Sequence, residues 1–369
     1  MRVLVTGGAG FIGSHLVDAS LRKGYEVRIL DSLDARVHPH GMPFCVAKDA
    51  EFIKGSVTDR LTWERALEGI DVIFHQAAYQ DYMLDFSRFL HVNAVSTALL
   101  YEVLVERGWR PRKVIIASSQ AVYGEGQYTC PIHGFFLAGN RSHEQLKVAD
   151  WEIRCPQCGE PATPKLMEEP YANPCNQYAV SKFSGELMGV GLGRLHRIPT
   201  VALRYSITQG PRQSLFNQYS GVLRIFATRA LAGEPLFVYE DGHQTRDFVH
   251  VDDVVDANMC VLEQDRADFE TFNVGSGLPT SILQYAELII GKLNTGARTI
   301  LPGQYRLGDN RHSVSSIAKL QKLGWNPQRG LAQIVDDFLS WVDQIGGIPS
   351  NVQDAYHDML NQGVIQPVR

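Results

Sequence analysis

The N-terminal segment MRVLVTGGAGFIG constrains the fold of this chain more than any other feature. A short apolar run, residues 2–6, leads directly into a glycine-rich turn, and a helical pattern begins near Phe11. The turn contains Gly7, Gly8, Gly10 and Gly13. Glycines at this spacing permit a tight turn and a close approach to a pyrophosphate, and the helix N-terminus supplies N–H groups and a favourable dipole. The segment therefore predicts a dinucleotide-binding turn, with a tight turn that binds nothing as the alternative.

The second apolar run indicates which dinucleotide to expect, because YEVRILD ends in Asp31. A carboxylate at the end of the second strand accepts hydrogen bonds from the ribose hydroxyls and repels a 2′-phosphate. The sequence therefore favours NAD over NADP. An ordinary strand-end carboxylate is the alternative interpretation of Asp31.

Apolar runs such as DVIFHQAA and KVIIASS alternate with helical patterns through the first half of the chain. Buried strands separated by helices predict an α/β fold with a doubly wound parallel sheet of the Rossmann type. After Arg204 the alternation is less regular, so we expect a smaller lobe over the C-terminal edge of the sheet. The expected divisions are an NAD-binding domain at 1–203 with an insertion at 127–172, a mainly substrate-binding lobe at 204–345, and a C-terminal extension at 346–369.

Composition narrows the functional classes. A chain of 369 residues is long enough for a large core, which suits an enzyme better than a bare binding module. The net charge is -5 and charges of both signs are interspersed, so neither nucleic acid nor an anionic membrane is expected as a partner. We find no signal-peptide pattern and no apolar run approaching the roughly 20 residues that span a bilayer. The expected location is the cytoplasm.

Tyr178 and Lys182 stand four residues apart in QYAVSKFSGE, a segment with helical periodicity. This spacing puts both side chains on one helical face. A neighbouring ammonium favours the phenolate, so Tyr178 can take a proton from a substrate hydroxyl while hydride leaves the same carbon for the cofactor. Ser119, at the end of a buried strand, is expected to hydrogen-bond the reacting oxygen. A solvated helix face for the pair and a capping role for the serine are the alternatives.

Two cysteine-containing turns indicate a metal site. TCPIHG holds Cys130 and His133, and RCPQCG holds Cys155 and Cys158. Pro and Gly in such turns let backbone amides face a metal-bound thiolate, and Cys3His is the composition of closed structural zinc sites. No ligand position is left open for catalysis. Free buried thiols or a vestigial ribbon are the alternatives, and disulfides are disfavoured in the cytosol.

Taken in chain order, the motifs TGGAGFIGSH, FHQAA, ASSQAVYG, YAVSK, LRYSITQGPR, RDFVHVDDVV and FNVGSG resemble the extended short-chain dehydrogenase/reductases that act on nucleotide sugars. The resemblance runs from residue 1 to about residue 340. It implies that Ser119, Tyr178 and Lys182 form the catalytic triad. It also implies that Tyr178, Lys182 and the following residues contact or support NAD: Thr6, Gly7, Gly10, Phe11, Ile12, Gly13, Asp31, Ser56, Val57, Ala77 and Asn93.

The residues after the serine distinguish reactions within this family. The 4,6-dehydratases carry an Asp-Glu pair there, the UDP-glucuronate decarboxylases carry a Glu at the second position, and enzymes of the fucose-synthase type have a Cys in this region. This chain has Gln120 and Ala121, which cannot transfer protons in that way. The resemblance therefore implies 4-epimerisation through a transient 4-keto sugar. A 4-reductase or dehydrogenase is the nearest alternative, and a dinucleotide-binding scaffold or redox sensor is the non-enzymatic one.

The resemblance also implies a substrate site and an assembly. Arg246 and Arg306 match the family's diphosphate clamp, and Gln120 and Ser206 are expected near the substrate. Ser206 and Ile207 depart from a frequent Phe-Asn pair, which leaves the sugar and the nucleotide open. A zinc-ribbon insertion at this place resembles a bacterial group described as dTDP-L-rhamnose 4-epimerase-like, and we expect it to shape the sugar pocket or the dimer. A homodimer through the helix of Tyr178 is expected from the family.

Overall fold

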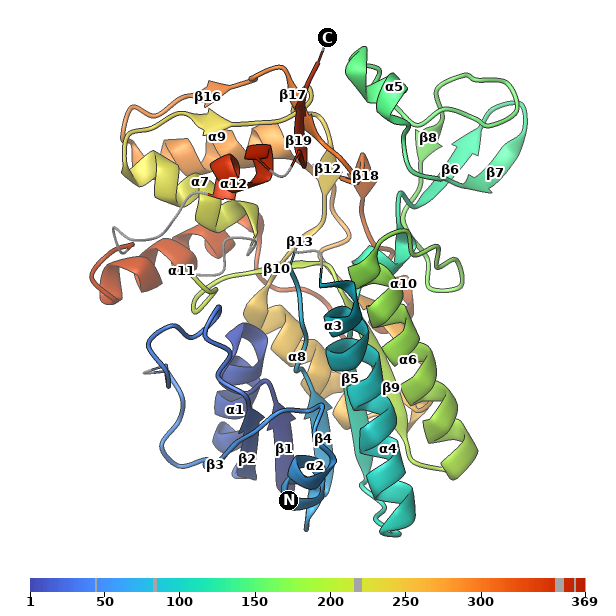
Figure 1. The fold of residues 1–369 in the computed structure, drawn as a ribbon, viewed down its shortest axis with the longest axis vertical. Helices are drawn as coiled ribbons and strands as arrows, with labels where there is room; N and C mark the ends of the chain where they lie inside the picture. The colour runs from blue at the N-terminus through green and yellow to red at the C-terminus, as the bar shows by residue number, and fades with distance from the viewer. Residues whose placement is uncertain (44, 82–84, 216–220, 349–354, 362, 369) are drawn as a thin grey trace.

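A seven-stranded parallel sheet forms the centre of the computed structural model, which describes residues 1–369 except 44, 82–84, 216–220, 349–354, 362 and 369 (Figure 1). The strand order is β14-β9-β5-β4-β1-β2-β3. These strands are β1 (Arg2–Thr6), β2 (Glu26–Asp31), β3 (Glu51–Lys54), β4 (Val72–His75), β5 (Lys113–Ser119), β9 (Thr200–Tyr205) and β14 (Thr271–Val274). The crossover order confirms the expected doubly wound α/β fold.

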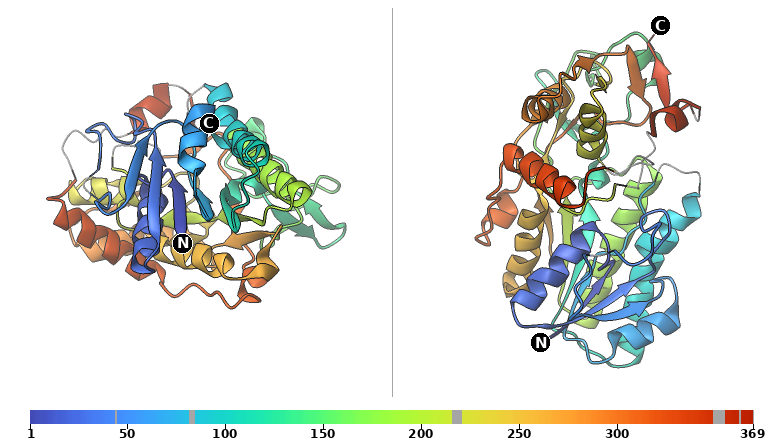
Figure 2. Two further views of the ribbon diagram at one scale, coloured as in Figure 1. Left: turned by 90° about the horizontal axis from the view of Figure 1, so that it is seen from below. Right: turned by 90° about the vertical axis from the view of Figure 1, so that its left-hand side faces the viewer.

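Helices cover both faces of this sheet (Figure 2). Strands β1 to β5 supply apolar side chains to both faces, whereas β9 and β14 supply them to one core. In β1, Val3 and Val5 join the core under α1 (Phe11–Arg22) and α8 (Val251–Leu262), whereas Leu4 joins the opposite core. That second core packs under α2 (Arg60–Leu67), α4 (Ser96–Glu106) and α6 (Gln177–His196). Burial on both faces explains why the strands read as nearly continuous apolar runs.

One helical stretch corrects an expectation from the sequence. Phe86–Glu106 is long and apolar enough to cross a membrane by length and composition, although no such run was expected. It comprises α3 (Phe86–Leu90), the π-helical η1 (His91–Val95) and α4. Half of its most apolar window is buried, and Leu100 and Val103 lie in the core against the sheet. Its hydropathy is therefore that of a core helix.

The lobe lies beyond the C-terminal ends of the sheet strands (Figure 1). Its core lies between three helices, α7 (Val222–Leu231), α9 (Ile282–Leu293) and α11 (Leu331–Gln344). Short strands complete it: β10 (Ile207–Gln209), β11 (Leu236–Phe237), β12 (Thr245–Arg246), β13 (Phe248–His250), β15 (Thr280–Ser281), β16 (Thr299–Ile300), β17 (Gln304–Arg306) and β18 (His312–Ser313).

The chain does not divide at residue 203 into two separate halves. After the first lobe strands it returns to the large sheet, where α8 covers one face and β14 pairs with β9. The 3-10 turn η3 (Asp265–Ala267) and α10 (Ala318–Gln321) also pack on that side, with Ala267 and Leu320 in the sheet core. Residues 251–274 therefore belong structurally to the sheet layer, within the range that the sequence assigned mainly to the lobe.

The insertion is a small separate unit. After η2 (Gln120–Tyr123), strand β6 (Gln127–Cys130) pairs antiparallel with β7 (Gly134–Leu137) and β8 (Thr163–Pro164), and α5 (His143–Lys147) follows β7. Tyr128, Ala138, Ile153 and Ala162 form its core. At the other end of the chain, α12 (Ala355–Asn361) and β19 (Ile365–Pro367) pack on the lobe, where β19 pairs with β17. The C-terminal extension is thus part of the lobe.

Helix α6 packs closely against η1, and we predict that a methyl group at Gly185 disrupts this packing. A Cβ atom at Gly185 would lie 2.2 Å from the Asn93 carbonyl oxygen, which is backbone and cannot rotate away. Gly185→Ala should lower the free energy of unfolding by about 1–3 kcal/mol, measured by chemical denaturation. Gly191→Ala is the matched control, because nothing lies within 4 Å of its Cβ position. It should stabilise the same helix by up to about 1 kcal/mol. Equal stabilities of the two variants would contradict this packing.

Candidate active site

The glycine-rich turn is shaped by close approach of its own backbone to neighbouring strands. Gly7 has a φ of +67°, and a Cβ there would lie 2.9 Å from the backbone of Ala77. A Cβ at Gly13 would lie 2.1 Å from the Gly7 carbonyl oxygen. Only glycine fits both positions, because the turn folds back on the first turn of α1 and touches the end of β4. The space above the turn stays clear for a ligand.

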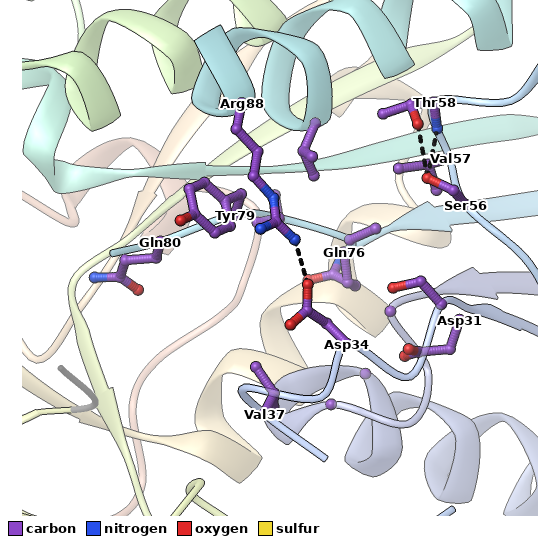
Figure 3. Close-up of a pocket in the computed structure, with 18 of the residues that line it drawn as sticks. Asp31, Asp34, Val37, Ser56, Val57, Thr58, Gln76, Tyr79, Gln80 and Arg88 are labelled. Atoms are coloured by element: carbon purple, nitrogen blue, oxygen red, sulfur yellow. Dashed lines mark hydrogen bonds and ion pairs between the residues drawn. The ribbon is translucent and has the colours of Figure 1, made fainter. Parts of the chain in front are cut away.

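A cavity of about 820 Å³ opens over this turn at the carboxyl ends of the central strands (Figure 3). Many of the residues predicted to hold NAD line it: Gly7, Gly10, Phe11, Ile12, Gly13, Asp31, Ser56, Val57, Ala77, Tyr178 and Lys182. They come from loops that follow β1, β2, β3 and β4 and from helix α6. The structure therefore brings segments far apart in the chain to one elongated site.

Asp31 has a defined orientation at the end of β2. One carboxylate oxygen accepts a hydrogen bond from the Ala9 amide at 3.0 Å, and the other accepts one from the Leu33 amide at 2.8 Å. These bonds tie the glycine-rich turn to the neighbouring strand end. Because each carboxylate oxygen can accept more than one hydrogen bond, Asp31 retains acceptor capacity toward a ribose in the cavity.

Asn93 and Thr6 support the cavity from behind. Neither is among the residues that line it. The Asn93 amide donates to the Ser181 hydroxyl at 2.9 Å, and its oxygen accepts the Tyr79 amide at 2.7 Å. The Thr6 hydroxyl accepts the Ala77 amide at 3.1 Å. Asn93 therefore fixes the loop after β4 to α6, the helix that carries Tyr178.

Sequence reasoning missed a charged cluster at the rim of the cavity. Arg88, from α3, forms an ion pair with Asp34 across the cavity, and its guanidinium lies 4.5 Å from the Tyr79 ring centroid (Figure 3). Arg36 donates to the Tyr79 hydroxyl at 2.7 Å. None of these residues belongs to the motifs recognised in the sequence. Asp34, Arg36 and Tyr79 lie in loops after strand ends, which could have suggested them, whereas nothing local points to Arg88.

Tyr178 and Lys182 lie on the first turns of α6, which Asn176 caps by accepting the Ala179 amide at 2.8 Å. Burial raises the pKa of Tyr178, and a hydrogen bond with Ser119 opposes that shift. Burial lowers the pKa of Lys182 to about 8, with the Glu186 carboxylate acting in the opposite direction. Lys182 is therefore largely protonated at neutral pH. Tyr178 and Lys182 thus line the cavity, and Ser119 is hydrogen-bonded to Tyr178.

The helix that carries this pair is anchored to the sheet by a buried polar group. Arg204 in β9 pairs with Glu186, with Nε and Oε2 2.9 Å apart and NH2 and Oε1 2.6 Å apart. Ser118 donates to the same carboxylate at 2.6 Å. Because Glu186 stands one helical turn beyond Lys182, this network sets the orientation of the face that carries Tyr178 and Lys182. The sequence analysis did not recognise this pair.

A second cavity of about 270 Å³ is lined mainly by residues of the lobe, and Gln80 lines both cavities. Arg246 and Arg306, the two arginines expected to contact the substrate, line it together with Asp309. The aromatic side chains of Phe237, Tyr239 and Tyr356 also line it. Tyr356 comes from the C-terminal extension, so this extension supplies part of the cavity wall.

The other two residues expected near the substrate are placed differently. Gln120 is buried beside Ser119, and its side-chain oxygen has no hydrogen-bond partner among the described residues. Gln120 lines neither cavity. Ser206 is buried as well, but it donates to Asp247 at 2.9 Å and lines neither cavity. Its direct contact with substrate is not supported, because Asp247 holds it in the protein interior.

Comparisons with known proteins agree with this geometry. The model of the family described as "NAD dependent epimerase/dehydratase family" matches residues 3–143 and 155–275. The chain belongs to the NAD-dependent epimerase/dehydratase family. A dTDP-L-rhamnose 4-epimerase from Burkholderia thailandensis is 31% identical over 350 residues, which are 93% of this chain and 95% of that protein.

Two solved UDP-glucose 4-epimerases have the same fold. A UDP-glucose 4-epimerase from Thermus thermophilus, in complex with NAD, superposes with a TM-score of 0.72 at 29% identity and covers 92% of this chain and 99% of its own. A UDP-glucose 4-epimerase from Thermotoga maritima, with UDP-glucose, has a TM-score of 0.73 at 28% identity and covers 94% and 99%.

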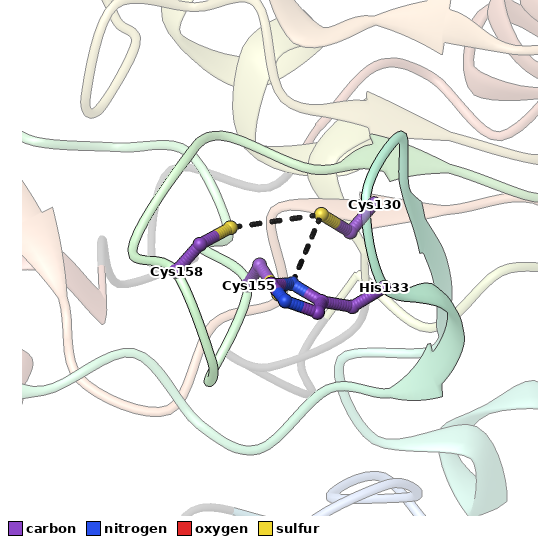
Figure 4. Close-up of side chains that lie close together, drawn as sticks. All are labelled: Cys130, His133, Cys155 and Cys158. Atoms are coloured by element: carbon purple, nitrogen blue, oxygen red, sulfur yellow. Dashed lines mark hydrogen bonds between the residues drawn. The ribbon is translucent and has the colours of Figure 1, made fainter.

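The family match is interrupted at residues 144–154, which lie inside the insertion. The insertion also contains the four predicted metal ligands, and their side chains lie close together (Figure 4). The ligand atoms of Cys130, His133, Cys155 and Cys158 lie within 4.8 Å of one another. The Cys130 and Cys158 sulfurs are 3.7 Å apart, and the Cys155 sulfur is 3.4 Å from His133 Nδ1. A tetrahedral zinc with Zn–S bonds of ~2.3 Å separates two sulfurs by about 3.8 Å, so the arrangement fits this ion.

Proposed function

We propose that the protein is an NAD-dependent 4-epimerase of a nucleoside diphosphate sugar. The supporting observation is the meeting of Ser119, Tyr178 and Lys182 beside a dinucleotide cavity, with Gln120 and Ala121 as the next residues. Neither of these two side chains can donate or accept a proton as an acid or base. The triad alone suffices for oxidation and reduction at one carbon, which is what 4-epimerisation requires.

In this proposal two residues of the triad act on one oxygen of the sugar, and the third acts on the tyrosine. Tyr178 takes the proton of the C4 hydroxyl, and Ser119 hydrogen-bonds the same oxygen. The Lys182 ammonium favours the phenolate that accepts the proton. NAD, when bound, supplies the acceptor and then the donor of hydride at C4. The keto sugar turns over in the pocket, and Tyr178 returns the proton to the oxygen after reduction on the other face.

We assign the nucleoside diphosphate to the second cavity. Arg246 and Arg306 there offer planar guanidinium groups, which bind phosphate oxygens in a bidentate manner. Phe237 and Tyr356, whose ring centroids are 5.1 Å apart, offer apolar surface for a base. Anchoring at the diphosphate leaves the hexose free to rotate, because the triad lies in the other cavity.

A 4-reductase or dehydrogenase is the nearest alternative, because it needs the same triad. A reductase would consume NADH and a dehydrogenase would consume NAD with each turnover, whereas an epimerase leaves the bound cofactor unchanged. A dehydratase or a decarboxylase is less favoured, because Gln120 and Ala121 lack acid–base groups. A dinucleotide-binding scaffold or redox sensor would bind NAD but convert no sugar.

A panel of UDP-, dTDP-, GDP- and CDP-sugars, with product analysis, tests the proposal. We expect one class to be converted to its C4 epimer without net NADH formation.

Tyr178→Phe should lower kcat by at least about 100-fold, because the phenol is the proton acceptor, while NAD affinity stays within about twofold. Leu61→Ala, an exposed change on α2 away from both cavities, is the control for folding. Undiminished turnover in Tyr178→Phe would rule out this role, and net NADH production would favour the dehydrogenase.

We also propose that Cys130, His133, Cys155 and Cys158 bind a structural zinc ion. Burial would raise the pKa of the Cys155 thiol, but hydrogen bonds from the Cys158 and Gln157 amides and from His133 lower it to about 6. Backbone donors directed at a sulfur are the arrangement that favours a metal-bound thiolate. Because the apolar core of the insertion is small, a bound metal would contribute most of the stability of this unit.

Metal analysis of the purified protein should find one zinc per chain. Cys158→Ser removes one ligand, so we expect loss of the zinc and a lower unfolding temperature. Cys175→Ser is the matched control, because Cys175 is a free, partly buried thiol outside the ligand set. Inductively coupled plasma mass spectrometry and thermal denaturation measure both effects. Zinc bound in full by Cys158→Ser would contradict the assignment.

An apolar face on neighbouring helices supports the expected homodimer. Helix α6 exposes Val180, Leu187, Met188 and Leu195, which share one side at helical spacing. Phe86 and Leu90 of α3, beside α6, are also exposed (Figure 1). We propose that two copies of this cytoplasmic enzyme pack through this face.

Light scattering should give the mass of two chains in solution. The double variant Leu187→Glu and Leu195→Glu should lower this mass to that of one chain, because charged side chains would then interrupt the apolar face. Exposed Leu278, on the lobe, provides the control variant Leu278→Glu, which should remain dimeric. A wild-type mass of one chain would exclude the dimer.

A further inference from the structure

The insertion is joined to the lobe by charged side chains that are almost fully buried. Arg141, with a side chain 1% exposed, extends from the insertion to Glu240 of the lobe. Its NH1 and NH2 atoms donate to the two Glu240 oxygens, each at 2.9 Å. Its Nε donates to Glu125 Oε1 at 3.2 Å. The two carboxylates compensate the charge of the buried guanidinium only while these contacts are kept. The junction therefore has little freedom to shift.

Arg311 of the lobe completes the junction. Its backbone amide donates to Glu125 Oε2 at 2.8 Å, and its NH1 donates to Glu240 Oε2 at 3.0 Å. Its NH2 donates to Glu152 of the insertion at 2.7 Å. Glu125 and Glu240 are thus each shared by Arg141 and Arg311. The insertion and the segment around residue 311 are held by the same carboxylates.

Backbone conformation indicates that the position of Glu240 matters. Its φ is +55°, in the left-handed region, although it is not a glycine. Such a conformation is strained and persists where surrounding contacts determine it. The bidentate bond to Arg141 and the bond from Arg311 are those contacts. The adjacent Tyr239 lines the second cavity, so the strained residue lies directly behind that cavity's wall.

The same segment holds both arginines of the second cavity. Arg246 donates to the Asn310 carbonyl at 2.7 Å and to Asp309 Oδ1 at 3.2 Å. Arg306 donates to Asp309 Oδ2 at 3.2 Å. Burial would raise the pKa of Asp309, but Arg306, Arg246 and Arg141 lower it to about 2. Arg141 in turn donates to the Asp309 carbonyl at 2.7 Å. A direct chain of contacts therefore runs from the insertion to both guanidinium groups.

We propose that Arg141 and Glu152 of the insertion are positioning residues for the diphosphate site. They fix residues 309–311, and these residues orient Arg246 and Arg306 toward the cavity before the substrate binds. Preorganised donors bind a diphosphate more tightly, because binding then costs less ordering of the groups involved. The insertion acts on nucleotide binding and not on the NAD cavity, since its charged contacts lead to the lobe. This inference rests on the proposed function.

The test compares three variants of the full-length, zinc-loaded protein. Arg141→Gln removes the buried guanidinium, and Glu152→Gln removes a partly exposed contact to Arg311 with little risk to folding. Lys165→Gln is the matched control, because it removes one charge from an exposed position of the same insertion. Calorimetry measures Kd for UDP, dTDP and NAD, kinetics separates KM from kcat, and metal analysis verifies the zinc.

For Arg141→Gln we expect the Kd of the preferred nucleoside diphosphate and the KM of its sugar to rise by about tenfold or more. Glu152→Gln should produce a smaller rise in the same direction. NAD affinity, zinc content and kcat should stay within about twofold to threefold of wild type, and Lys165→Gln should match wild type. If Arg141→Gln does not fold, Glu152→Gln decides the question.

Two results would overturn the inference, and they differ in what else they affect. If the wild type binds neither UDP nor dTDP nor any other nucleoside diphosphate of the panel, the proposed function fails and the positioning role fails with it. If the wild type binds one of them and folded Arg141→Gln and Glu152→Gln bind it equally well, the proposed function stands and only the positioning role is excluded.

Discussion

The site depends on one constraint: a parallel sheet buried on both faces leaves its carboxyl edge as the place where polar groups can gather. The turn after β1 brings Gly7, β2 ends in Asp31, and β3 is followed by Ser56. β4 leads to Ala77, and β5 ends in Ser119. Because parallel strands all point the same way, these residues meet although they are far apart in the chain. The cavity for the dinucleotide is a consequence of the topology.

Buried charge networks then fix the elements that the sheet alone does not orient. Glu186 and Arg204 connect helix α6 to the sheet, and Asn93 connects it to the loop after β4. Arg141 and Arg311 do the same between the insertion and the lobe. Removing one partner from such a pair leaves an uncompensated buried charge, so these contacts hold one geometry strongly. The fold thus keeps the cavity lined by Tyr178 and Lys182 separate from the cavity lined by Arg246 and Arg306.

The insertion contains a cluster of candidate metal ligands in addition to its buried ion pairs. Its apolar core consists of a few side chains, which is little for an independent unit, and four clustered ligand atoms suit a metal that would compensate. One end of the insertion therefore has a metal-ligand cluster and the other has the ion pairs to the lobe. This arrangement gives an inserted segment a defined place beside the substrate cavity.

Local patterns in the sequence were sufficient for the fold class, the glycine-rich turn, the pairing of Tyr178 with Lys182, and the two cysteine-containing turns. Each depends on short spacing along the chain, which fixes strand, turn or helix geometry without reference to distant residues. The apolar stretch at Phe86–Glu106 was underestimated, because a core helix against a sheet is nearly as apolar as a membrane span. Ser206 donates a hydrogen bond to Asp247, which is distant in the sequence. The residues next to Ser206 therefore could not predict its buried position.

Only the tertiary structure could show that Arg88 lies over Tyr79, that β14 returns to the large sheet, and that Arg141 reaches Glu240. These contacts join residues separated by long stretches of chain, and charged side chains carry no periodic signal of their partners. The sequence by itself determined which chemistry the chain can support, through residue types at fixed local spacing. The tertiary structure decided which groups hold that chemistry in place, because long-range packing and desolvation of charge select the partners.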